Sequence, residues 1–547
     1  MDDKLNTNLM RRVCIGDMIR KRVINEPQKE VIVFSYKGKI IRRLTIEELN
    51  REANRFANAI MELGVKKGDR VAIFSHNCVQ YVDLLIALSK MGGWITPINF
   101  ALKSREILPI VNHSETVMLV VEDELADTIM EVVGEMHSVK HKVMINLSGN
   151  RSIPEGWLDF DELCSEKYSD DEPMVEINDN DVLTLMYTSG TEAMPKGVLN
   201  SHLNWFSSIM NFCMDFGRWS PPEGIQLGAI PLFHVAGHLA IFLTLVQGDK
   251  FVLLYTPDPS EVMQIIKSEK INSIGLPPTV FVNMLNMPDG EKLMKELFGT
   301  VRSCTIFGSP IPEATMRRIM EILPEVYWQN YYGQSELTPL GTTLKSPDLL
   351  RKFGEAEERF DGAEPIGQSH AVVEMRVVDD DDNEVPPGTV GEMVVRSPTT
   401  MLGYYKEEEK TRETFRGGWH HTGDLAIMDE ERYYYFVDRK KDIIKTGAEN
   451  VSSIEVENWV AKHPKVAECT AVGLIHERWG EAVTIFVSPK PGDSLSEDEI
   501  IQHCKQGLAG YKVPKKVVVL DELPKNPSGK ILKKNLRKEY SGIYNRS

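Results

Sequence analysis

The sequence lacks any apolar run long enough to cross a membrane, which takes about 18 to 20 uncharged residues. Its most apolar stretch, LAIFLTLVQGDKFVLLY, is interrupted by Gly248, Asp249 and Lys250. The N-terminal MDDKLNTNLMRRVCIGD has no apolar segment of the signal-peptide type, and the C-terminal IYNRS matches no common address signal. These absences predict a cytoplasmic protein without a transmembrane segment.

Cysteine is scarce, and its spacing excludes two classes of site. The seven cysteines are scattered singly, and no pair of them has metal-ligand or redox spacing. Their odd number argues against a disulfide framework. We therefore expect reduced thiols that are mostly buried.

Positive charge is also in short supply. The formal net charge of the 547 residues is −17, which disfavours nonspecific binding to nucleic acid. The charge is uneven, however, because the chain from Lys505 onward holds 11 basic and 3 acidic residues. This basic end is either a solubilising surface or the part of a site that meets phosphates.

Helix-like and strand-like segments alternate over the first 130 residues and again around FVLLY, EVMQIIKSEKI and SCTIFGSP. The segment TIEELNREANRFANAIMELGV has helical spacing, with Thr45 as its N-cap and Glu48 completing a capping box. Strands separated by helices predict a largely parallel α/β sheet with buried strands.

The pattern changes from about residue 364. EMRVVDDDDNEVPPGTVGEMVVRS contains two strands around an acidic Pro-Gly turn, which predicts a hairpin, and a smaller α/β unit follows YYYFVDRKKDIIKTG. We expect an α/β fold with a large N-terminal domain, residues 1–437, made of α/β subdomains and a β-rich portion. A small α/β C-terminal domain, residues 438–547, follows a boundary near Asp438.

The segment LMYTSGTEAMPKGVLNSH has the composition of a phosphate-binding loop. It combines three hydroxyls, a flexible glycine, exposed backbone amides and one lysine, which together can wrap an anionic chain. The Walker A spacing is absent, because no glycine precedes Lys196. The preceding DVLTLMY is typical of a strand, so the loop would lie at a strand's carboxyl end, where ligands bind in α/β sheets.

Six segments occur in the order of the motifs of one family. They are YTSGTEAMPKGV, PLFHVAGH, NYYGQSE, HHTGDL, DRKKDIIKTGAENVSSIEVE and PKNPSGKILKK. From end to end the chain resembles the adenylate-forming acyl-CoA synthetases of the AMP-binding superfamily. The resemblance implies two half-reactions: a carboxylate attacks the α-phosphorus of ATP to give acyl-AMP and pyrophosphate, and the thiol of CoA then displaces AMP. Catalysis of the first half needs mainly positioning and charge neutralisation.

The resemblance also implies a nucleotide site. Tyr332 would stack on adenine, Asp424 would bind the ribose hydroxyls, and Glu336 would ligate Mg²⁺ on the phosphates. The residues that the resemblance assigns to ATP or AMP are Thr188, Ser189, Gly190, Thr191, Lys196, Tyr331, Tyr332, Gly333, Ser335, Asp424, Arg439 and Lys530. Ser335 stands where the family usually has threonine, so the hydroxyl is retained.

Catalysis and thiol transfer are assigned to the C-terminal region by the same resemblance. Lys530 would offset the charge that develops between the acid and the α-phosphate, a contact typically worth roughly 10² to 10³ in rate. The small domain would be mobile and rotate about a hinge at Asp438. The residues then expected near CoA are Lys441, Lys445, Gly447 and Ala448, of which Ala448 replaces the family's glycine and crowds the thiol channel slightly.

Glu192 departs from the family, which mostly has Thr-Gly where this chain has Glu192-Ala193. A carboxylate about 4 Å from one phosphate charge is opposed by roughly 4 kcal/mol at an effective dielectric of about 20. We therefore expect Glu192 either to point away from the phosphates or to serve as a second Mg²⁺ ligand beside Glu336.

The acyl group would lie against FHVAGH and FGSPIP, with His234 near the carboxylate as a second catalytic residue and Val235, Gly308 and Leu337 along the walls. These segments contain neither Asp nor Arg, so an apolar acid is favoured over an amino acid, whose ammonium would need a partner. A medium- or long-chain fatty acid is the preferred substrate, and an aryl acid stays open.

Other readings of the sequence also stay open. The chain is a CoA ligase, a carrier-protein-loading adenylation enzyme or an oxygen-dependent luciferase. Whether it forms a homodimer also stays open. A catalytically silent nucleotide-binding regulatory protein is the alternative from another class. Such a protein would be expected to lose Lys530 or Glu336, and both are present.

Overall fold

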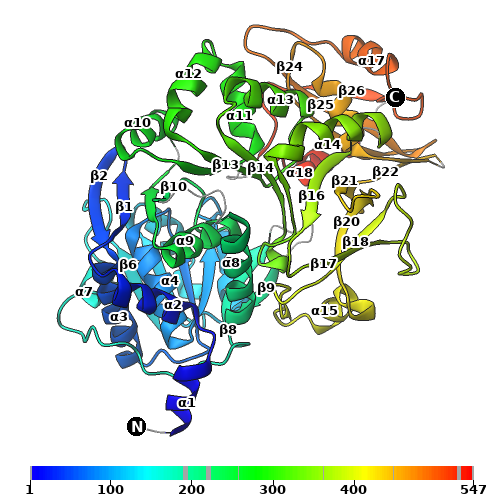
Figure 1. The fold of residues 1–547 in the computed structure, drawn as a ribbon. Coiled ribbons are helices and arrows are strands. Elements are labelled where there is room, and N and C mark those ends of the chain that lie inside the picture. Colours follow the sequence, from blue (N-terminus) through cyan, green and yellow to red (C-terminus); the bar gives the residue numbers. More distant parts are fainter. Residues whose placement is uncertain are drawn as a thin grey trace.

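The computed structural model describes residues 3–188, 195–216, 223–256, 258–360, 363–447, 449–525 and 531–544. Within these ranges the chain forms three sheets with helices packed on and between them (Figure 1). None of the helices in these ranges has both the length and the apolar character that crossing a membrane requires.

The first sheet has eight described strands in the order β19-β9-β8-β4-β3-β5-β6-β7. Their bounds are β3 Arg70–Phe74, β4 Trp94–Ile98, β5 Met118–Glu122, β6 His141–Ile145, β7 Leu158–Asp159, β8 Val182–Thr188, β9 Lys196–Ser201 and β19 Gly403–Tyr404. The strands from β8 through β4 to β7 run parallel, whereas β9 is antiparallel to both β8 and β19. The predicted parallel α/β arrangement is therefore confirmed for this sheet.

Local sequence signals explain the helices of this region. Helix α3 (Ile46–Glu62) begins at the predicted capping box, in which Glu48 N donates to Thr45 Oγ1 at 3.2 Å and Thr45 N donates to Glu48 Oε2 at 2.8 Å. Every residue of α4 (Val79–Met91) is buried. The remaining short elements here are α5 Ser104–His113, η1 Asp123–Leu125, α6 Ala126–Met130, η2 Val133–Glu135 and α7 Phe160–Leu163.

The second sheet has thirteen described strands in the order β17-β18-β20-β21-β16-β15-β14-β13-β12-β10-β11-β1-β2. Their bounds are β1 Glu30–Tyr36, β2 Lys39–Thr45, β10 Ile225–Gly228, β11 Lys250–Leu254, β12 Ser273–Leu276, β13 Ser303–Phe307, β14 Tyr327–Tyr332, β15 Thr342–Lys345, β16 Glu364–Ser369, β17 Glu374–Val378, β18 Gly391–Arg396, β20 His420–Met428 and β21 Tyr434–Arg439. The β1-to-β14 side is parallel, and the strands from β14 through β21 to β17 are antiparallel. The antiparallel side is the predicted β-rich portion, and it includes the predicted β17-β18 hairpin.

The most apolar stretch of the sequence becomes helix α9 (Val235–Gln247) followed by β11. The helix ends because Gly248 takes a left-handed conformation with φ 75°, which a residue without a side chain adopts readily. The interruption read from the sequence is therefore a helix-to-strand turn.

The other helices before the small sheet are α1 Asp3–Arg11, α2 Ile15–Asn25, α8 His202–Phe216, α10 Pro259–Glu269, α11 Pro278–Asn286, α12 Gly290–Leu297, η3 Phe298–Thr300, α13 Glu313–Ile322, η4 Ser335–Leu337, α14 Ser346–Arg359, α15 Glu408–Thr414 and η5 Arg416–Gly418. One continuous apolar core joins the first sheet to the second, and it includes Ile73 on β3, Phe242 on α9 and Phe251 on β11. All seven cysteines are free, and four of them are buried.

The third sheet is small and follows β21 along the chain. Its strands are β22 Ile444–Thr446, β23 Glu449–Val451, β24 Val466–His476, β25 Gly480–Pro489 and β26 Lys516–Val519, and its helices are α16 Ser453–Ala461, α17 Glu497–Lys505 and α18 Lys533–Glu539. It has its own apolar core, formed by residues such as Val456 and Ile485. Figure 1 shows this unit, orange to red, beside α14, where Lys462 Nζ pairs with Glu357 Oε1 at 2.5 Å.

Candidate active site

The two ends of the phosphate-type loop are held side by side in the first sheet. Thr188 ends β8 and Lys196 begins β9, and these two residues are partners in the antiparallel ladder. Ser189, Gly190, Thr191 and Glu192 lie outside the described residues. The loop therefore starts at the end of β8 and returns at the beginning of β9, the strand that pairs with β19.

Tyr404 on β19 links two of the predicted site residues. Its hydroxyl donates to Glu336 Oε1 at 3.1 Å, and Lys196 Nζ lies 4.9 Å from the centre of its ring. Burial, helped by the neighbouring Glu336 carboxylate, raises the pKa of Tyr404, so the hydroxyl stays protonated as a donor. The sequence prediction missed this residue, although the aromatic pair in LGYYKE was a visible signal.

The NYYGQSE segment is fixed from two other directions. Asn200 Nδ2 on β9 donates to Ser335 O at 3.2 Å, and Met401 N donates to Glu336 O at 2.8 Å. Leu337, at the end of η4, is fully buried. This backbone support holds the Glu336 carboxylate beside β9 and β19.

Asp424 on β20 gathers a second group of polar side chains. Its Oδ2 accepts hydrogen bonds from the Tyr332 hydroxyl and from Gln334 Nε2, both at 2.7 Å. Arg439, its partner in the β20-β21 ladder, places Nε 3.7 Å from Oδ1. Gln334 was also missed from the sequence, where it stands inside a motif whose flanking residues were chosen. The structure thus brings Tyr332, Asp424 and Arg439 together.

Tyr331 lies on the other side of the strand from Tyr332, as alternation along β14 requires. Its ring packs against Phe212 and His370, with ring centres 5.0 and 5.7 Å apart, and its hydroxyl donates to Pro339 O at 3.4 Å. Gly333 is needed for a close backbone approach, because a Cβ there would lie 1.5 Å from Pro339 O.

His234 caps the start of α9 and is half-buried, with its ring packed against Phe233 at a distance of 4.2 Å between ring centres. Its Nε2 is buried and has no hydrogen-bond partner among the residues that the structure describes. Burial lowers the pKa of His234 to about 4, so the imidazole is neutral near pH 7. Val235 follows it as the first residue of α9.

Gly308 follows β13 with φ +93°, and a Cβ built on it would meet no heavy atom within 4 Å. The loop after it is tied to the NYYGQSE segment by Glu364, whose Oε1 accepts from Ile311 N and from Asn330 Nδ2, both at 3.0 Å. Burial raises the pKa of Glu364 to about 7. The sequence offered no signal for this buried carboxylate beyond its place at the start of β16.

The residues expected near CoA are divided between two places. Burial, together with the Arg439 guanidinium, lowers the pKa of Lys441, and Asp424 and Lys196 are close enough to act on it as well. Lys445 N instead donates to Glu481 Oε2 and Gly447 N to Trp479 O, both within the small sheet. Ala448 and Lys530 lie outside the described residues.

Asp438 is buried between the second sheet and the small one. Its Oδ2 accepts from Ser453 N at 2.6 Å and from Ser453 Oγ at 2.8 Å, and its Oδ1 accepts from Arg439 N at 2.7 Å. The carboxylate therefore connects the last strand of the large sheet to the first turn of α16.

A cluster of acids elsewhere needs a different explanation. Among the described residues, Glu355, Asp429 and Glu431 have carboxylate oxygens within 4.8 Å of one another. Lys352 Nζ lies among them, 2.7 Å from Asp429 and 2.8 Å from Glu355, so the positive charge in this cluster is an ammonium.

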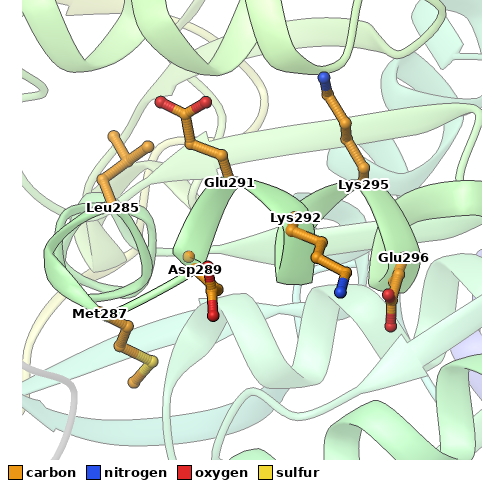
Figure 2. Close-up of a pocket in the computed structure, with 8 residues that line it drawn as sticks. Leu285, Met287, Asp289, Glu291, Lys292, Lys295 and Glu296 are labelled. Carbon is orange, nitrogen blue, oxygen red and sulfur yellow. The ribbon is translucent and has the colours of Figure 1, made fainter.

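A surface hollow of about 760 Å³ lies between α11 and α12, lined by Leu285, Met287, Asp289, Gly290, Glu291, Lys292, Lys295 and Glu296. Figure 2 shows Glu291 and Lys295 on one side of α12 and Lys292 and Glu296 on the other. Its charged groups therefore do not converge on one point, unlike those around Tyr404 and Asp424.

Comparison with known proteins agrees with this geometry. Residues 19–405 match the family described as AMP-binding enzyme, and residues 455–530 match the AMP-binding enzyme C-terminal domain. The chain therefore belongs to the AMP-binding enzyme family. Its class is that of the adenylate-forming acyl-CoA ligases, which are acid–thiol ligases.

Three proteins similar to this chain are named for different acids. The long-chain-fatty-acid–CoA ligase FadD13 of Mycobacterium tuberculosis is 31% identical over 539 residues, covering 96% of this chain and 98% of its own. A feruloyl-CoA synthase of Amycolatopsis is 32% identical over 502 residues, covering 91% and 94%. The structure of the anthranilate CoA ligase AuaEII with anthranoyl-AMP is 25% identical, with a TM-score of 0.85 over 97% of this chain and 98% of that one.

Proposed function

We propose that this chain activates a medium- or long-chain fatty acid with ATP and transfers the acyl group to CoA, with an aryl acid as the second candidate. The observation that carries the proposal is that the NYYGQSE segment contributes to each of two clusters of polar side chains. Glu336 accepts from the Tyr404 hydroxyl, and Lys196 lies beside the Tyr404 ring. Tyr332 donates to Asp424, which lies beside Arg439. The first group suits a polyphosphate and the second a nucleoside.

At the phosphate end, Thr188, Lys196 and the loop between them would hold the β and γ phosphates. Mg²⁺ commonly uses one or two protein carboxylates and completes its shell with water and phosphate oxygens. Glu336, whose Oε1 is already oriented by Tyr404, fits that donor set, with Glu192 as a second candidate ligand. When bound, the ion would neutralise phosphate charge.

At the nucleoside end, Asp424 would accept hydrogen bonds from the ribose hydroxyls. Its Oδ2 already accepts from Tyr332 and Gln334, so these two residues fix the carboxylate before the ribose arrives. Tyr332 would stack on the adenine, and Arg439 would close the other side of the sugar.

In the first half-reaction the carboxylate of the acid attacks the α-phosphorus and pyrophosphate leaves. His234 would orient the carboxylate of the acid, because its imidazole is neutral near pH 7 and its buried Nε2 has no protein partner in the described residues. A neutral imidazole orients the carboxylate without forming an ion pair that would reduce its nucleophilicity. Lys530 would supply the positive charge between the carboxylate and the α-phosphate. Its loop leaves and rejoins the described chain at the bridge between Lys525 and Ile531.

For the second half-reaction we propose that the domain of residues 438–547 rotates about Asp438. The support is positional: Asp438 joins the last long strand of the large sheet to α16 through Ser453. Rotation would exchange the Lys530 loop for the segment bearing Lys445, Gly447 and Ala448. These residues would then meet CoA together with Lys441, which already lies near Asp424.

The test is to incubate the protein with ATP, Mg²⁺, CoA and a panel of fatty and aryl acids and to identify the thioesters formed by their molecular mass. We expect an acyl-CoA, AMP and pyrophosphate in equal amounts from at least one acid. Formation of acyl-AMP without thioester at saturating CoA would contradict the proposed transfer, and ADP in place of AMP would contradict the proposed activation.

A further inference from the structure

Helix α8 carries four polar side chains along one face. Asn204, Ser208, Asn211 and Asp215 are spaced by four, three and four residues, which places them one above another on a helix. Asn204, Ser208 and Asn211 are buried, and Asp215 is half-buried. A stripe of this kind inside a protein needs hydrogen-bond partners along its whole length.

The two ends of the stripe have such partners. Asn204 Nδ2 donates to Pro398 O at 2.8 Å and to Thr400 O at 2.9 Å. Asp215 Oδ1 accepts from Lys345 Nζ at 3.2 Å, and its Oδ2 contacts His370 Nδ1. These partners show that the stripe faces the antiparallel strands that continue from the NYYGQSE segment.

The middle of the stripe has none. Ser208 Oγ and both amide atoms of Asn211 are buried and have no hydrogen-bond partner among the described residues. Only 1% of Asn211 is exposed, so bulk water does not solvate its amide. An amide and a hydroxyl buried without partners are costly, so the site is expected to receive its partner from outside the protein chain.

The middle of the stripe lies next to the proposed acyl end of the active site. Phe212, the neighbour of Asn211, packs against Tyr331 and His370. His370 N in turn donates to Gly341 O. Gly341 lies close to the backbone of Tyr332, because a Cβ on this glycine would be 2.5 Å from Tyr332 O. Asn204 contacts Thr400 O, next to the Thr399 O that accepts from Thr338 Oγ1, and Asp215 contacts Lys345. The middle of the stripe therefore lies along the segment from Thr338 to Lys345, which follows Leu337, one of the residues expected along the acyl wall.

We propose that Ser208 and Asn211 bind a neutral hydrogen-bonding group, a hydroxyl or a carbonyl, carried by the acyl part of the acid. The inference rests on the proposed function and names the substrate class more narrowly. An amide offers one kind of donor and one acceptor and a hydroxyl offers both, but neither offers charge. The substrate is therefore a hydroxylated or keto acid, aliphatic or aryl, and the unsubstituted acid of equal length is a poorer substrate.

The test compares matched acids in the wild type and in Asn211→Leu. The pairs are decanoate against its hydroxydecanoates and cinnamate against 4-hydroxycinnamate, with kcat/KM measured by pyrophosphate release. Sites that hydrogen-bond a substrate hydroxyl reject the analogue without it strongly, so we expect a preference of about tenfold or more in at least one pair. Asn211→Leu should remove most of that preference without lowering kcat/KM for the unsubstituted acid or changing KM for ATP. Ser208→Ala should act in the same direction and more weakly.

Asn204→Leu is the matched control, because it removes an amide from the same face whose partners are backbone carbonyls. It should lower the thermal midpoint and leave the preference unchanged, whereas Asn211→Leu should leave the midpoint unchanged or raise it. An unaltered preference in Asn211→Leu, an equal loss of activity on every acid, or failure of this variant to fold would overturn the inference. If no acid at all supports pyrophosphate release in the wild type, the proposed function fails instead.

Discussion

Replacing Tyr404 with phenylalanine removes one hydroxyl and keeps the ring that Lys196 faces. The lost bond is the one donated to the Glu336 carboxylate at 3.1 Å. Hydrogen bonds to charged groups contribute about 1.5 to 3 kcal/mol. At about 1.36 kcal/mol per tenfold change, this corresponds to roughly 10- to 150-fold. Because Glu336 is the proposed metal ligand, we expect the Mg²⁺ concentration for half-maximal pyrophosphate release to rise by this factor.

A second substitution separates the hydroxyl from the ring. Tyr404→Leu also removes the aromatic face 4.9 Å from Lys196 Nζ, a contact worth about 0.5 to 2 kcal/mol. It should therefore raise KM for ATP by a further factor of about 2 to 30. Tyr405→Phe is the control, since that hydroxyl donates to the exposed Glu115 outside the site. An unchanged Mg²⁺ requirement in Tyr404→Phe would refute the positioning role.

Three further predictions test other parts of the structure. Gln334→Leu removes a donor 2.7 Å from Asp424, so KM for ATP should rise about tenfold while the penalty for 2′-deoxy-ATP shrinks; an undiminished penalty would contradict ribose binding at this carboxylate. Glu364 has its pKa raised to about 7, so the folded state holds a proton that the unfolded state loses above about 4.5, and stability falls as pH rises between these values. The difference in unfolding free energy between Glu364→Gln and the wild type, measured by denaturant titration, should therefore be more favourable to the variant at pH 8 than at pH 4.5 by on the order of 3 kcal/mol. A difference that does not change with pH would exclude the buried carboxylate as its cause. Lys352→Met leaves the buried Asp429 carboxylate without its ammonium partner and should cost about 3 to 5 kcal/mol of stability in denaturant unfolding, against under about 1 for the exposed Arg359→Gln; equal costs would count against the buried pair.

Local signals in the sequence were enough for most of the fold. The capping box of Thr45 and Glu48 depends on residues three apart, and the glycine at 248 ends α9 by its own conformational freedom. Alternating patterns likewise predicted the parallel sheet and the β17-β18 hairpin. These features were readable because each is decided by neighbours along the chain.

The site was less readable, because its contacts join distant parts of the chain. Tyr404 reaches Glu336 across 68 residues, and Glu364 reaches Ile311 across 53. No local pattern distinguishes the Gln334 side chain, whose role depends on Asp424 being 90 residues away. The family motifs named the charged residues of the site and Tyr332, but not Tyr404 and Gln334, the other neutral side chains that orient the two carboxylates.

The exchange of labelled pyrophosphate into ATP tests the central claim most directly, since it requires reversible formation of an acyl-adenylate. With an acid that the protein activates, the account predicts exchange in the wild type that depends on that acid and is lost in Lys530→Ala, while supplied acyl-AMP is still converted to thioester. Absence of acid-dependent exchange in the wild type would contradict the account, and equal loss of both half-reactions in Lys530→Ala would contradict the role of that lysine.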